Sequence, residues 1–386
     1  MKKVIFFIIC CLVLNLFPFF VYADEKMDLI PNATSGLLMD ADTGKIIFKK
    51  DINNRVAVAS MTKMVAQIII MEEIDKGTIK WDDVITVSKN AADMGGSQIY
   101  ITEGEKITIE DLMKGISMAS GNDATVAMAE VISGTEVKFV KRMNDKVKEL
   151  GLKNTFFKNC TGLDEDGHYS TAYDMAIIAR ELVTKYPEIL RFSSVYEDYL
   201  RENTDNKFWL VNTNKLVHFY EGADGLKTGH TDNAGYCLAA TAKRNNVRLI
   251  AIVLGEKNAT VRNNETMDLL DYGYQNIRVK KLLSRDKILK KLKVDKADNE
   301  IVEIKLINDL VVSEFVGDVN DNYDLDIQVD ELKLPLKVGD VVGKVVVSSD
   351  GKVIKEGFLT VKKNVAALSF WELFIRELND LFTGEF

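Results

Sequence analysis

The chain has 386 residues, of which 47% are hydrophobic and 28% charged, a composition that fits roughly two globular domains and excludes a disordered or collagen-like polypeptide. Its formal net charge of −8 argues against a nucleic-acid-binding protein, which should carry a basic surface. The three histidines form no HExxH pattern and no CxxC pattern accompanies them, so we expect neither a metal site nor any other cofactor. Catalysis would have to come from other side chains.

The first 23 residues have the pattern of a secretory signal peptide. Lys2 and Lys3 precede an apolar stretch over residues 4–14, and the small residue Ala23 precedes an acidic pair. An uncleaved membrane anchor is the alternative, because the apolar stretch is nearly long enough to span a bilayer. We expect cleavage, and therefore an exported protein at the outer face of the cytoplasmic membrane, in an extracytoplasmic or periplasmic location.

Residues 24–275 form the first predicted domain. Residues 35–49 predict a β-hairpin around the Asp42–Thr43–Gly44 turn, and residues 60–74 predict a buried helix, because apolar side chains cover most of its circumference. Four more helices and a long antiparallel hairpin are predicted at 109–119, 122–132, 135–150, 171–185 and 236–255. Strands at both ends with helices between them predict an α+β fold, an antiparallel sheet with flanking helices.

Residues 276–363 form the second predicted domain, a small all-β unit of short alternating segments. The Asp350–Gly351 pair between two apolar runs is a strong hairpin signal. This segment carries no set of chemically reactive residues, so we interpret it as a spacer or interaction module. Beyond residue 23 the chain has only Cys160 and Cys237, too few for a disulfide framework, and we expect buried thiols.

Residues 364–386 predict an amphipathic helix. Apolar side chains from Ala366 to Phe382 fall in one broad arc, on which Glu377 is the one charged residue. The segment is too polar to span a bilayer but suits a helix lying on the membrane surface with Trp371 inserted. Its polar face is more acidic than basic, so membrane affinity would come from apolar burial. The alternative is packing against its own domain or a second copy.

The pattern SxxK at Ser60-Met61-Thr62-Lys63 is the first candidate catalytic motif. Residues i and i+3 of a helix are neighbours, so the Lys63 amine would lie beside the Ser60 hydroxyl, as an activated nucleophile requires where no histidine is the base. A helix start also directs unpaired backbone N–H groups towards a reacting carbonyl. Alone the motif is weak, because residues 284–287 and 349–352 match it too.

Two further motifs follow in the chain. Ser120-Gly121-Asn122 lies between two predicted helices, although Ser88-Lys89-Asn90 has the same pattern. Lys227-Thr228-Gly229-His230 occurs once, on an expected exposed strand before the 236–255 hairpin. Its lysine and hydroxyl offer an anchor for a carboxylate, and its glycine would let a substrate backbone approach closely.

The order of the three motifs is far more specific than any one of them. SxxK, a serine-containing middle motif and KTG are the signature of penicillin-binding proteins and class A β-lactamases. Residues 35–273 resemble the serine-type D-alanyl-D-alanine carboxypeptidases, the low-molecular-weight penicillin-binding proteins. The quoted landmarks are Ala59-Ser-Met-Thr-Lys, Met118-Ala-Ser-Gly-Asn-Asp-Ala, Ser170-Thr-Ala-Tyr-Asp-Met-Ala and Asp224-Gly-Leu-Lys-Thr-Gly-His-Thr. The family plan also includes a signal peptide, a small β domain and a terminal anchor, although the terminal helix here lacks the family's basic face.

This resemblance implies catalytic roles for three residues. Ser60 would be the nucleophile, Lys63 its general base, and Ser120 a proton relay to the leaving amine. A lysine acts as a base near neutral pH only if its pKa falls from about 10.4. Repulsion from Lys227 in the same cleft, added to burial, would lower it, and we expect Lys63 to be the neutral lysine.

The resemblance also implies a substrate-binding set. Asn122 would hold the substrate, and Lys227 and Thr228 would bind its terminal carboxylate with help from Arg262. The backbone N–H groups of Ser60 and His230 would form the oxyanion hole, beside Gly229.

The implied reaction is acyl transfer without a cofactor. Ser60 would attack the penultimate D-Ala of a peptidoglycan stem peptide, release the last D-Ala and then be freed by water; β-lactam antibiotics would acylate it covalently. A D,D-endopeptidase acting on peptide cross-links uses the same residues and stays open. A class A-like β-lactamase would need a Glu-x-x-Leu-Asn segment, which residues 121–226 lack. A non-catalytic wall-binding protein would carry no acylable serine.

Overall fold

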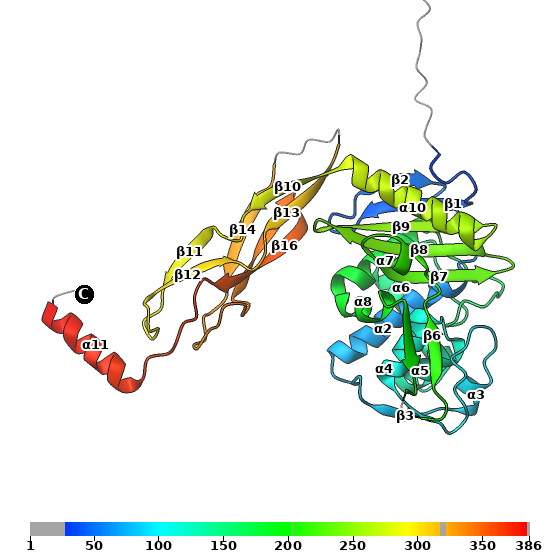
Figure 1. Cartoon of the computed structure of the whole chain (residues 1–386), viewed down its shortest axis with the longest axis horizontal. Helices are drawn as coiled ribbons and strands as arrows, with labels where there is room; N and C mark the ends of the chain where they lie inside the picture. The colour runs from blue at the N-terminus through cyan, green and yellow to red at the C-terminus, as the bar shows by residue number, and fades with distance from the viewer. Residues whose placement is uncertain (1–27, 203, 317–321, 384–386) are drawn as a thin grey trace, which may run out of the picture.

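The computed structural model describes residues 28–202, 204–316 and 322–383. The predicted signal peptide lies outside these residues. Figure 1 shows a mixed helix and sheet domain, then a smaller domain of strands, then a terminal helix, α11. The predicted α+β class with a following all-β domain is confirmed.

A five-stranded antiparallel sheet forms the centre of the larger domain, in the order β2-β1-β9-β8-β7. Its strands are β1 (Ser35–Asp40), β2 (Ile46–Lys50), β7 (Ala223–Thr231), β8 (Gly235–Arg244) and β9 (Val247–Glu256). Because side chains alternate along a strand, Leu37 packs into one core and its neighbour Leu38 into another. The strand β7, which carries the KTG motif, therefore lies at an edge of a sheet whose two faces are both buried.

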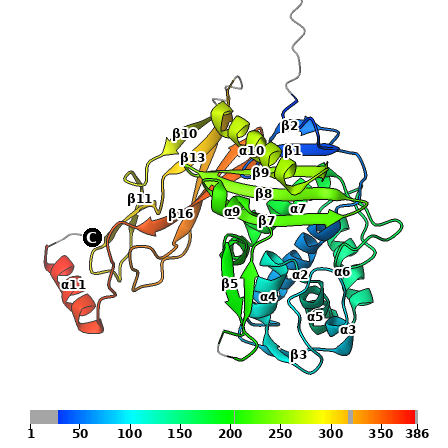
Figure 2. The same cartoon turned by 45° about the vertical axis from the view of Figure 1, so that its right-hand side comes forward.

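Helices cover both faces of this sheet (Figures 1 and 2). α10 (Ala259–Asn276) packs on one face through Leu269 and Leu270. The other face carries the larger core and the remaining long helices: α2 (Lys63–Asp75), α4 (Ile109–Met118), α5 (Asn122–Ser133), α6 (Glu136–Glu149) and α7 (Ala172–Lys185). Thr108, Thr135 and Thr171 cap three of them, each accepting a backbone N–H of the first turn. The helices α2 and α4 to α7 confirm the predicted ones, whereas α10 was not predicted from the sequence.

Short elements complete this domain, and the sequence did not predict them. They are a 3₁₀ turn η1 (Ala59–Thr62), η2 (Pro187–Ile189), α3 (Lys89–Ala92), α8 (Leu190–Ser193), α9 (Leu216–Phe219) and two hairpins, β3 (Val84–Thr86) with β4 (Lys106–Thr108) and β5 (Glu197–Leu200) with β6 (Phe208–Val211). The helix predicted from Ser60 therefore begins with a 3₁₀ turn, and its α-helical part begins at Lys63.

The smaller domain holds a five-stranded sheet in the order β11-β12-β16-β15-β14 and a two-stranded β10–β13 pair. The strands are β10 (Ile277–Leu283), β11 (Ile288–Lys293), β12 (Ile301–Leu306), β13 (Leu310–Phe315), β14 (Asp324–Val329), β15 (Gly343–Ser349) and β16 (Lys352–Val361). The predicted hairpin at Asp350–Gly351 is confirmed as β15–β16. Cys160 and Cys237 are free and buried in the larger domain, as expected.

The terminal helix α11 (Phe370–Thr383) begins six residues later than predicted. The backbone just before it is used elsewhere, because Ala366 O accepts from Asp298 N and Leu368 N donates to Lys296 O. Ser369 then starts the helix with a capping box, in which Ser369 and Glu372 bond each other's side chains and backbone N–H groups. None of the helices in the described ranges combines the length and apolarity needed to cross a bilayer.

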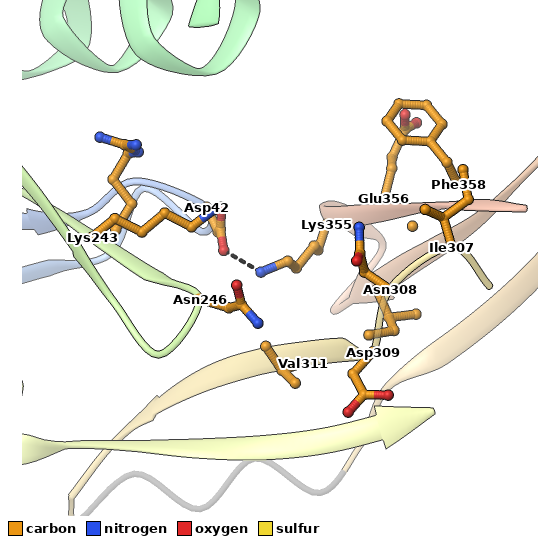
Figure 3. Close-up of a pocket in the computed structure, with 13 residues that line it drawn as sticks. Asp42, Lys243, Asn246, Ile307, Asn308, Asp309, Val311, Lys355, Glu356 and Phe358 are labelled. Carbon is orange, nitrogen blue, oxygen red and sulfur yellow. Dashed lines mark hydrogen bonds and ion pairs between the residues drawn. The ribbon is translucent and has the colours of Figure 1, made fainter. Parts of the chain in front are cut away.

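The two domains meet through the β1–β2 turn. Lys355 Nζ on β16 pairs with Asp42 Oδ2 at 2.5 Å, shown by the dashed line in Figure 3. Ser313 Oγ on β13 donates to Asp40, whose pKa burial raises. Beside the Asp42 pair is a cavity of about 340 Å³ lined by both domains. Polar contacts therefore help to hold the β domain in its position against the larger domain.

Candidate active site

The turn η1 holds Ser60 between β7 and the loop over residues 157–169. Ala59 has a left-handed φ of 46°, and two glycines allow the close approach of this turn. A Cβ on Gly162, which has φ +85°, would overlap the Ala59 carbonyl, and a Cβ on Gly229 would lie 2.7 Å from Val58 O. Gly229 was expected to leave space for a substrate backbone, but on the side where its Cβ would lie the structure places the turn η1.

Lys63 lies beside Ser60, as the SxxK spacing predicts. Its Nζ donates to Ser60 Oγ at 2.8 Å, to Asn122 Oδ1 at 2.6 Å and to Thr161 O at 2.7 Å. The side chain is fully buried, and burial lowers the pKa of Lys63 to about 7. The amine is therefore within hydrogen-bond reach of the hydroxyl, and with this pKa both its neutral and its charged forms are populated near pH 7.

The SGN segment brings Ser120 and Asn122 into the same site. Ser120 is buried with a left-handed φ of 62°, a conformation that is costly for serine. Within the described residues, its Oγ has no hydrogen-bond partner. Asn122 is positioned by two hydrogen bonds, because its Oδ1 accepts from Lys63 while its Nδ2 donates to Gly95 O at 2.7 Å, which leaves its second N–H available for a substrate. The Ser120 hydroxyl is likewise a polar group left for a ligand.

Asp123, which follows Asn122, links the SGN segment to the neighbouring backbone at residues 99–101. Its carboxylate accepts the backbone N–H groups of Ile99 and Ile101 at 3.0–3.2 Å. The competing motif at Ser88 is structural, since Ser88 caps α3 and donates to Glu130. The middle motif is therefore Ser120–Asn122.

The KTG strand adds a buried cationic group. Lys227 is 1% exposed and its Nζ donates to Thr228 O at 3.0 Å. Burial, then Lys63, then Arg262 hold the pKa of Lys227 well below its ordinary value. Arg262, from α10, is buried and donates to Asn263 Oδ1. Among the described residues, no ion pair includes Lys63, Lys227 or Arg262, so a bound anion would find basic groups without a carboxylate partner.

The predicted repulsion between the lysines is present, but it acts chiefly on Lys227. Burial is the main cause of the lowered pKa of both amines. Lys227, like Lys63, is thus deprotonated more easily than an ordinary lysine, whereas only Lys63 was expected to be neutral. His230 is exposed, and its ring stacks on Tyr236 at 4.0 Å between centroids.

Several contributors were missed from the sequence. Thr161 acts through its carbonyl, which accepts from both Lys63 and Ser60, and every residue type carries that group. His168 Nδ1 accepts from Lys158 N, so its Nε2 carries the proton and donates to Thr62 Oγ1 at 2.8 Å. Burial lowers the pKa of His168 to about 4, so it stays neutral. These contacts depend on chain folding that no local motif encodes.

Thr213 is a further missed residue. It accepts a hydrogen bond from Thr228 Oγ1 at 2.8 Å. It follows β6, an element that the sequence did not predict. No cluster of three or more His, Cys, Asp or Glu side chains suited to a metal occurs in the described part of the chain.

The chain is similar to known proteins over most of its length. A family model described as D-alanyl-D-alanine carboxypeptidase matches residues 24–258, and one described as penicillin-binding protein 5, C-terminal domain, matches residues 278–367. The chain is 46% identical over 354 residues to the D-alanyl-D-alanine carboxypeptidase DacF of Bacillus subtilis, covering 92% of this chain and 91% of that protein. It is 34% identical to DacA of Haemophilus influenzae, covering 91% of both chains.

Solved structures agree. Penicillin-binding protein 5 from Haemophilus influenzae has a TM-score of 0.64 at 32% identity, covering 87% of this chain and 98% of its own. Penicillin-binding protein D2 from Listeria monocytogenes, in an ampicillin-bound form, has a TM-score of 0.57 at 30% identity, covering 63% of this chain and 98% of its own. The chain therefore belongs to the D-alanyl-D-alanine carboxypeptidase family of low-molecular-weight penicillin-binding proteins, and carboxypeptidase is its activity.

Proposed function

We propose that this carboxypeptidase removes the terminal D-Ala from peptidoglycan stem pentapeptides through an acyl-enzyme on Ser60. The observation that carries the proposal is the 2.8 Å hydrogen-bond contact between the fully buried Lys63 amine, with a pKa of about 7, and the Ser60 hydroxyl; in the neutral amine the lone pair on Nζ accepts the Ser60 proton. A serine needs an adjacent base to become a nucleophile. Lys63 supplies that base without a histidine.

Acylation follows from the contacts of these residues. Neutral Lys63 takes the Ser60 proton as Oγ attacks the carbonyl carbon of the penultimate D-Ala. The backbone N–H groups of Ser60 and His230 stabilise the tetrahedral oxyanion. The proton then passes from Lys63 through the Ser120 hydroxyl to the leaving amine, and the C–N bond breaks to release D-Ala. Water attacks the ester next, and the same groups return Ser60 to its free form.

The negative charge of the substrate would also change the protonation states of Lys63 and Lys227. The terminal carboxylate would bind Lys227, Thr228 and Arg262. Neither Lys227 nor Arg262 has an ion-pair partner within the described residues. A bound anion favours the charged form of a nearby amine, so binding returns Lys227 to its ammonium form. That ammonium in turn keeps Lys63 neutral by repulsion, which is the state that the base requires.

β-Lactams would acylate the same serine. Penicillin-binding protein D2 is known in ampicillin-bound and cefotaxime-bound forms. The carboxylate of a β-lactam would occupy the anion site, and its strained amide would lie at Ser60. We propose them as covalent inhibitors of this chain.

The cellular placement that we propose is export, with α11 lying on the outer surface of the cytoplasmic membrane. Phe370 and Trp371 are 73% and 69% exposed, so neither ring is buried in the β domain. Neighbouring exposed apolar side chains mark a surface that binds a membrane or another protein. Both views place α11 at the end of the molecule away from the larger domain (Figures 1 and 2). An anchor there would leave the active site free to reach the wall.

The activity and the nucleophile can be tested together. Released D-Ala is measured with diacetyl-Lys-D-Ala-D-Ala for the wild type, Ser60→Ala and Ser284→Ala, the last being a control from a second SxxK pattern. We expect release by the wild type and the control, and a loss of at least about 1,000-fold in Ser60→Ala. Equal release by Ser60→Ala would overturn the Ser60 assignment, and no release by the wild type would overturn the substrate.

A further inference from the structure

The hairpin β5–β6 presents two aromatic rings to solvent on one face. Tyr199 and Trp209 are direct cross-strand partners, and they are 40% and 57% exposed. The other face carries Leu200 and Leu210, which are buried. Because side chains of a strand alternate between its faces, the inner face meets the packing needs of the hairpin. The two outer rings are therefore not needed for the core.

This outer face is continuous with the catalytic cleft. Pairing continues past β6, because Asn212 N donates to Tyr196 O at 2.7 Å. The outer row consists of Trp209, Val211 and Thr213, which are exposed or half-buried. Thr213 is hydrogen-bonded to Thr228 of the KTG strand. The row thus starts at the carboxylate end of the cleft and extends about 13 Å from it at the usual strand rise.

The hairpin is held rigidly against the rest of the domain. Asp198 pairs with Lys114 of α4 at 2.9 Å. Arg201, just past β5, pairs with Glu105 at 2.6 Å and donates to Ile99 O. In Figure 2 the hairpin runs down from the β7 edge beside α4. A surface fixed in this way loses little freedom when it binds a ligand.

The direction in which a bound stem peptide runs along β7 determines which part of the wall can contact the outer face of the hairpin. With its carboxylate at Lys227 and its carbonyl at Ser60, which lies beside Gly229, a stem peptide leaves the cleft towards Thr231. The hairpin lies at the opposite end, past the terminal carboxylate. The rest of the bound stem would therefore run away from the hairpin, so a ligand of this face would have to come from a different part of the wall.

The chemistry of the face fits a sugar. Lys207 Nζ lies 3.7 Å from the centre of the Tyr199 ring and 3.7 Å from Glu202, so charges of both signs surround the rings. A pyranose has a C–H face that packs on an aromatic ring and hydroxyl and acetamido groups that bond such polar neighbours. Two rings among charges are a small apolar area for a protein interface, and the mixed charge gives no attraction to an anionic membrane.

We propose that the outer face of β5–β6, centred on Trp209 and Tyr199, binds the sugar chain of a neighbouring peptidoglycan strand. The proposal rests on the proposed function, because it takes the wall as substrate. It assigns the hairpin a role in recognising the polymer, separate from the chemistry at Ser60.

The test compares a small and a polymeric substrate. Wild type, Trp209→Ala, Tyr199→Ala and the control Phe358→Ala, which removes a ring 54% exposed on the β domain, are assayed for D-Ala release from diacetyl-Lys-D-Ala-D-Ala and from purified peptidoglycan. Binding of N-acetylglucosamine hexamer is followed by isothermal titration calorimetry, which does not depend on the tryptophan that is replaced. We expect KM for peptidoglycan to rise about fivefold in each hairpin variant with kcat unchanged. The small peptide should be cleaved equally by all, and Trp209→Phe should keep most of the affinity.

Each other result has one meaning. Unchanged KM for peptidoglycan in both hairpin variants, or hexamer binding that survives Trp209→Ala, would overturn the sugar site while leaving the carboxypeptidase intact. Vesicle binding that is lost in Trp209→Ala would make the occupant a membrane and equally overturn it. No cleavage of the small peptide by the wild type would instead overturn the proposed function.

Discussion

Two buried amines, on Lys63 and Lys227, dominate the electrostatics of the site. Each is removed from water, and neither forms an ion pair with a carboxylate among the described residues. Their difference lies in their contacts. Lys63 reaches the nucleophile, whereas Lys227 donates only to a backbone carbonyl. The first is therefore suited to exchanging a proton, and the second to binding an anion.

The pKa of Lys63 predicts the pH dependence of acylation. Only the neutral amine can accept the Ser60 proton, and with a pKa of about 7 the neutral fraction falls tenfold per pH unit well below 7. We expect the rate constant for acylation by benzylpenicillin to rise from pH 5 to about 7 and to level off above about 8. Stopped-flow measurements across that range check this. A flat profile, or a rise only above pH 9, would contradict Lys63 as the base.

Replacing Lys227 with Met should separate binding from stability. The pKa of Lys227 is lowered on folding, so between that pKa and the ordinary value the unfolded chain holds a proton that the folded chain lacks. The Lys227 side chain therefore lowers the free energy of unfolding as pH falls through that range. Methionine does not titrate, so the substitution removes this loss of stability. We expect Tm at pH 7 to be equal or higher, while kcat/KM for the small peptide falls about 100-fold. A marked drop in Tm would show that Lys227 is a structural residue.

Among the elements, the loop over residues 157–169 is the one that completes the site. Its ends pair through Phe156 and Tyr169, the Thr161 carbonyl accepts from Lys63, and His168 holds Thr62. Asp164 near its tip accepts from Thr231 of β7. The loop thus fixes both η1 and one wall of the cleft.

Gly162→Ala tests this arrangement. A Cβ there would collide with the Ala59 backbone, whereas Gly151 has a similar positive φ and open space around it. We expect Gly151→Ala to cost about 1 kcal/mol in unfolding free energy from backbone strain alone, with normal acylation. Gly162→Ala should cost about 3 kcal/mol and slow penicillin acylation about 100-fold, because Ser60 is displaced. Equal effects of both variants would show that the clamp on η1 is unimportant.

Elements with a long apolar periodicity were predictable, whereas the short elements and the mostly polar helix α10 were not. The helices α4 to α7 and the β8–β9 hairpin carry apolar periodicity over ten or more residues, which tertiary packing reinforces. The hairpin β5–β6 has four-residue strands, too short for a periodic signal. The start of α11 was misplaced because Ala366 and Leu368 continue the apolar pattern while their backbone bonds to the β domain.

The site shows the same division. Ser60, Lys63, Ser120 and Lys227 are marked by side-chain chemistry within short motifs, and the structure brings these motifs together. Arg262 could be named only through resemblance, because nothing local ties an arginine on α10 to β7. Thr161 contributes a carbonyl, which leaves no mark in a sequence. Sequence patterns thus identify reactive side chains better than the backbone that holds them.

For the molecule as a whole, the separation of the helix α11 from the larger domain predicts that anchoring and catalysis are independent. We expect Phe370→Ser with Trp371→Ser to abolish co-sedimentation with phospholipid vesicles while D-Ala release from the small peptide stays unchanged. Neutral and anionic vesicles should bind the wild type similarly, because affinity comes from apolar burial. Phe358→Ser is the matched control. Vesicle binding that survives in the double variant would contradict α11 as the anchor.

The central claim is that Ser60, activated by Lys63, forms the acyl-enzyme, and mass spectrometry tests it most directly. The chain from Asp24 onward is incubated with benzylpenicillin, digested and mapped, with Ser60→Ala as the control, and D-Ala release from diacetyl-Lys-D-Ala-D-Ala is measured in parallel. We predict one penicilloyl group, located on Ser60 and absent from the control, together with release of D-Ala by the unmodified enzyme. An adduct on another residue, or no adduct, would contradict the account.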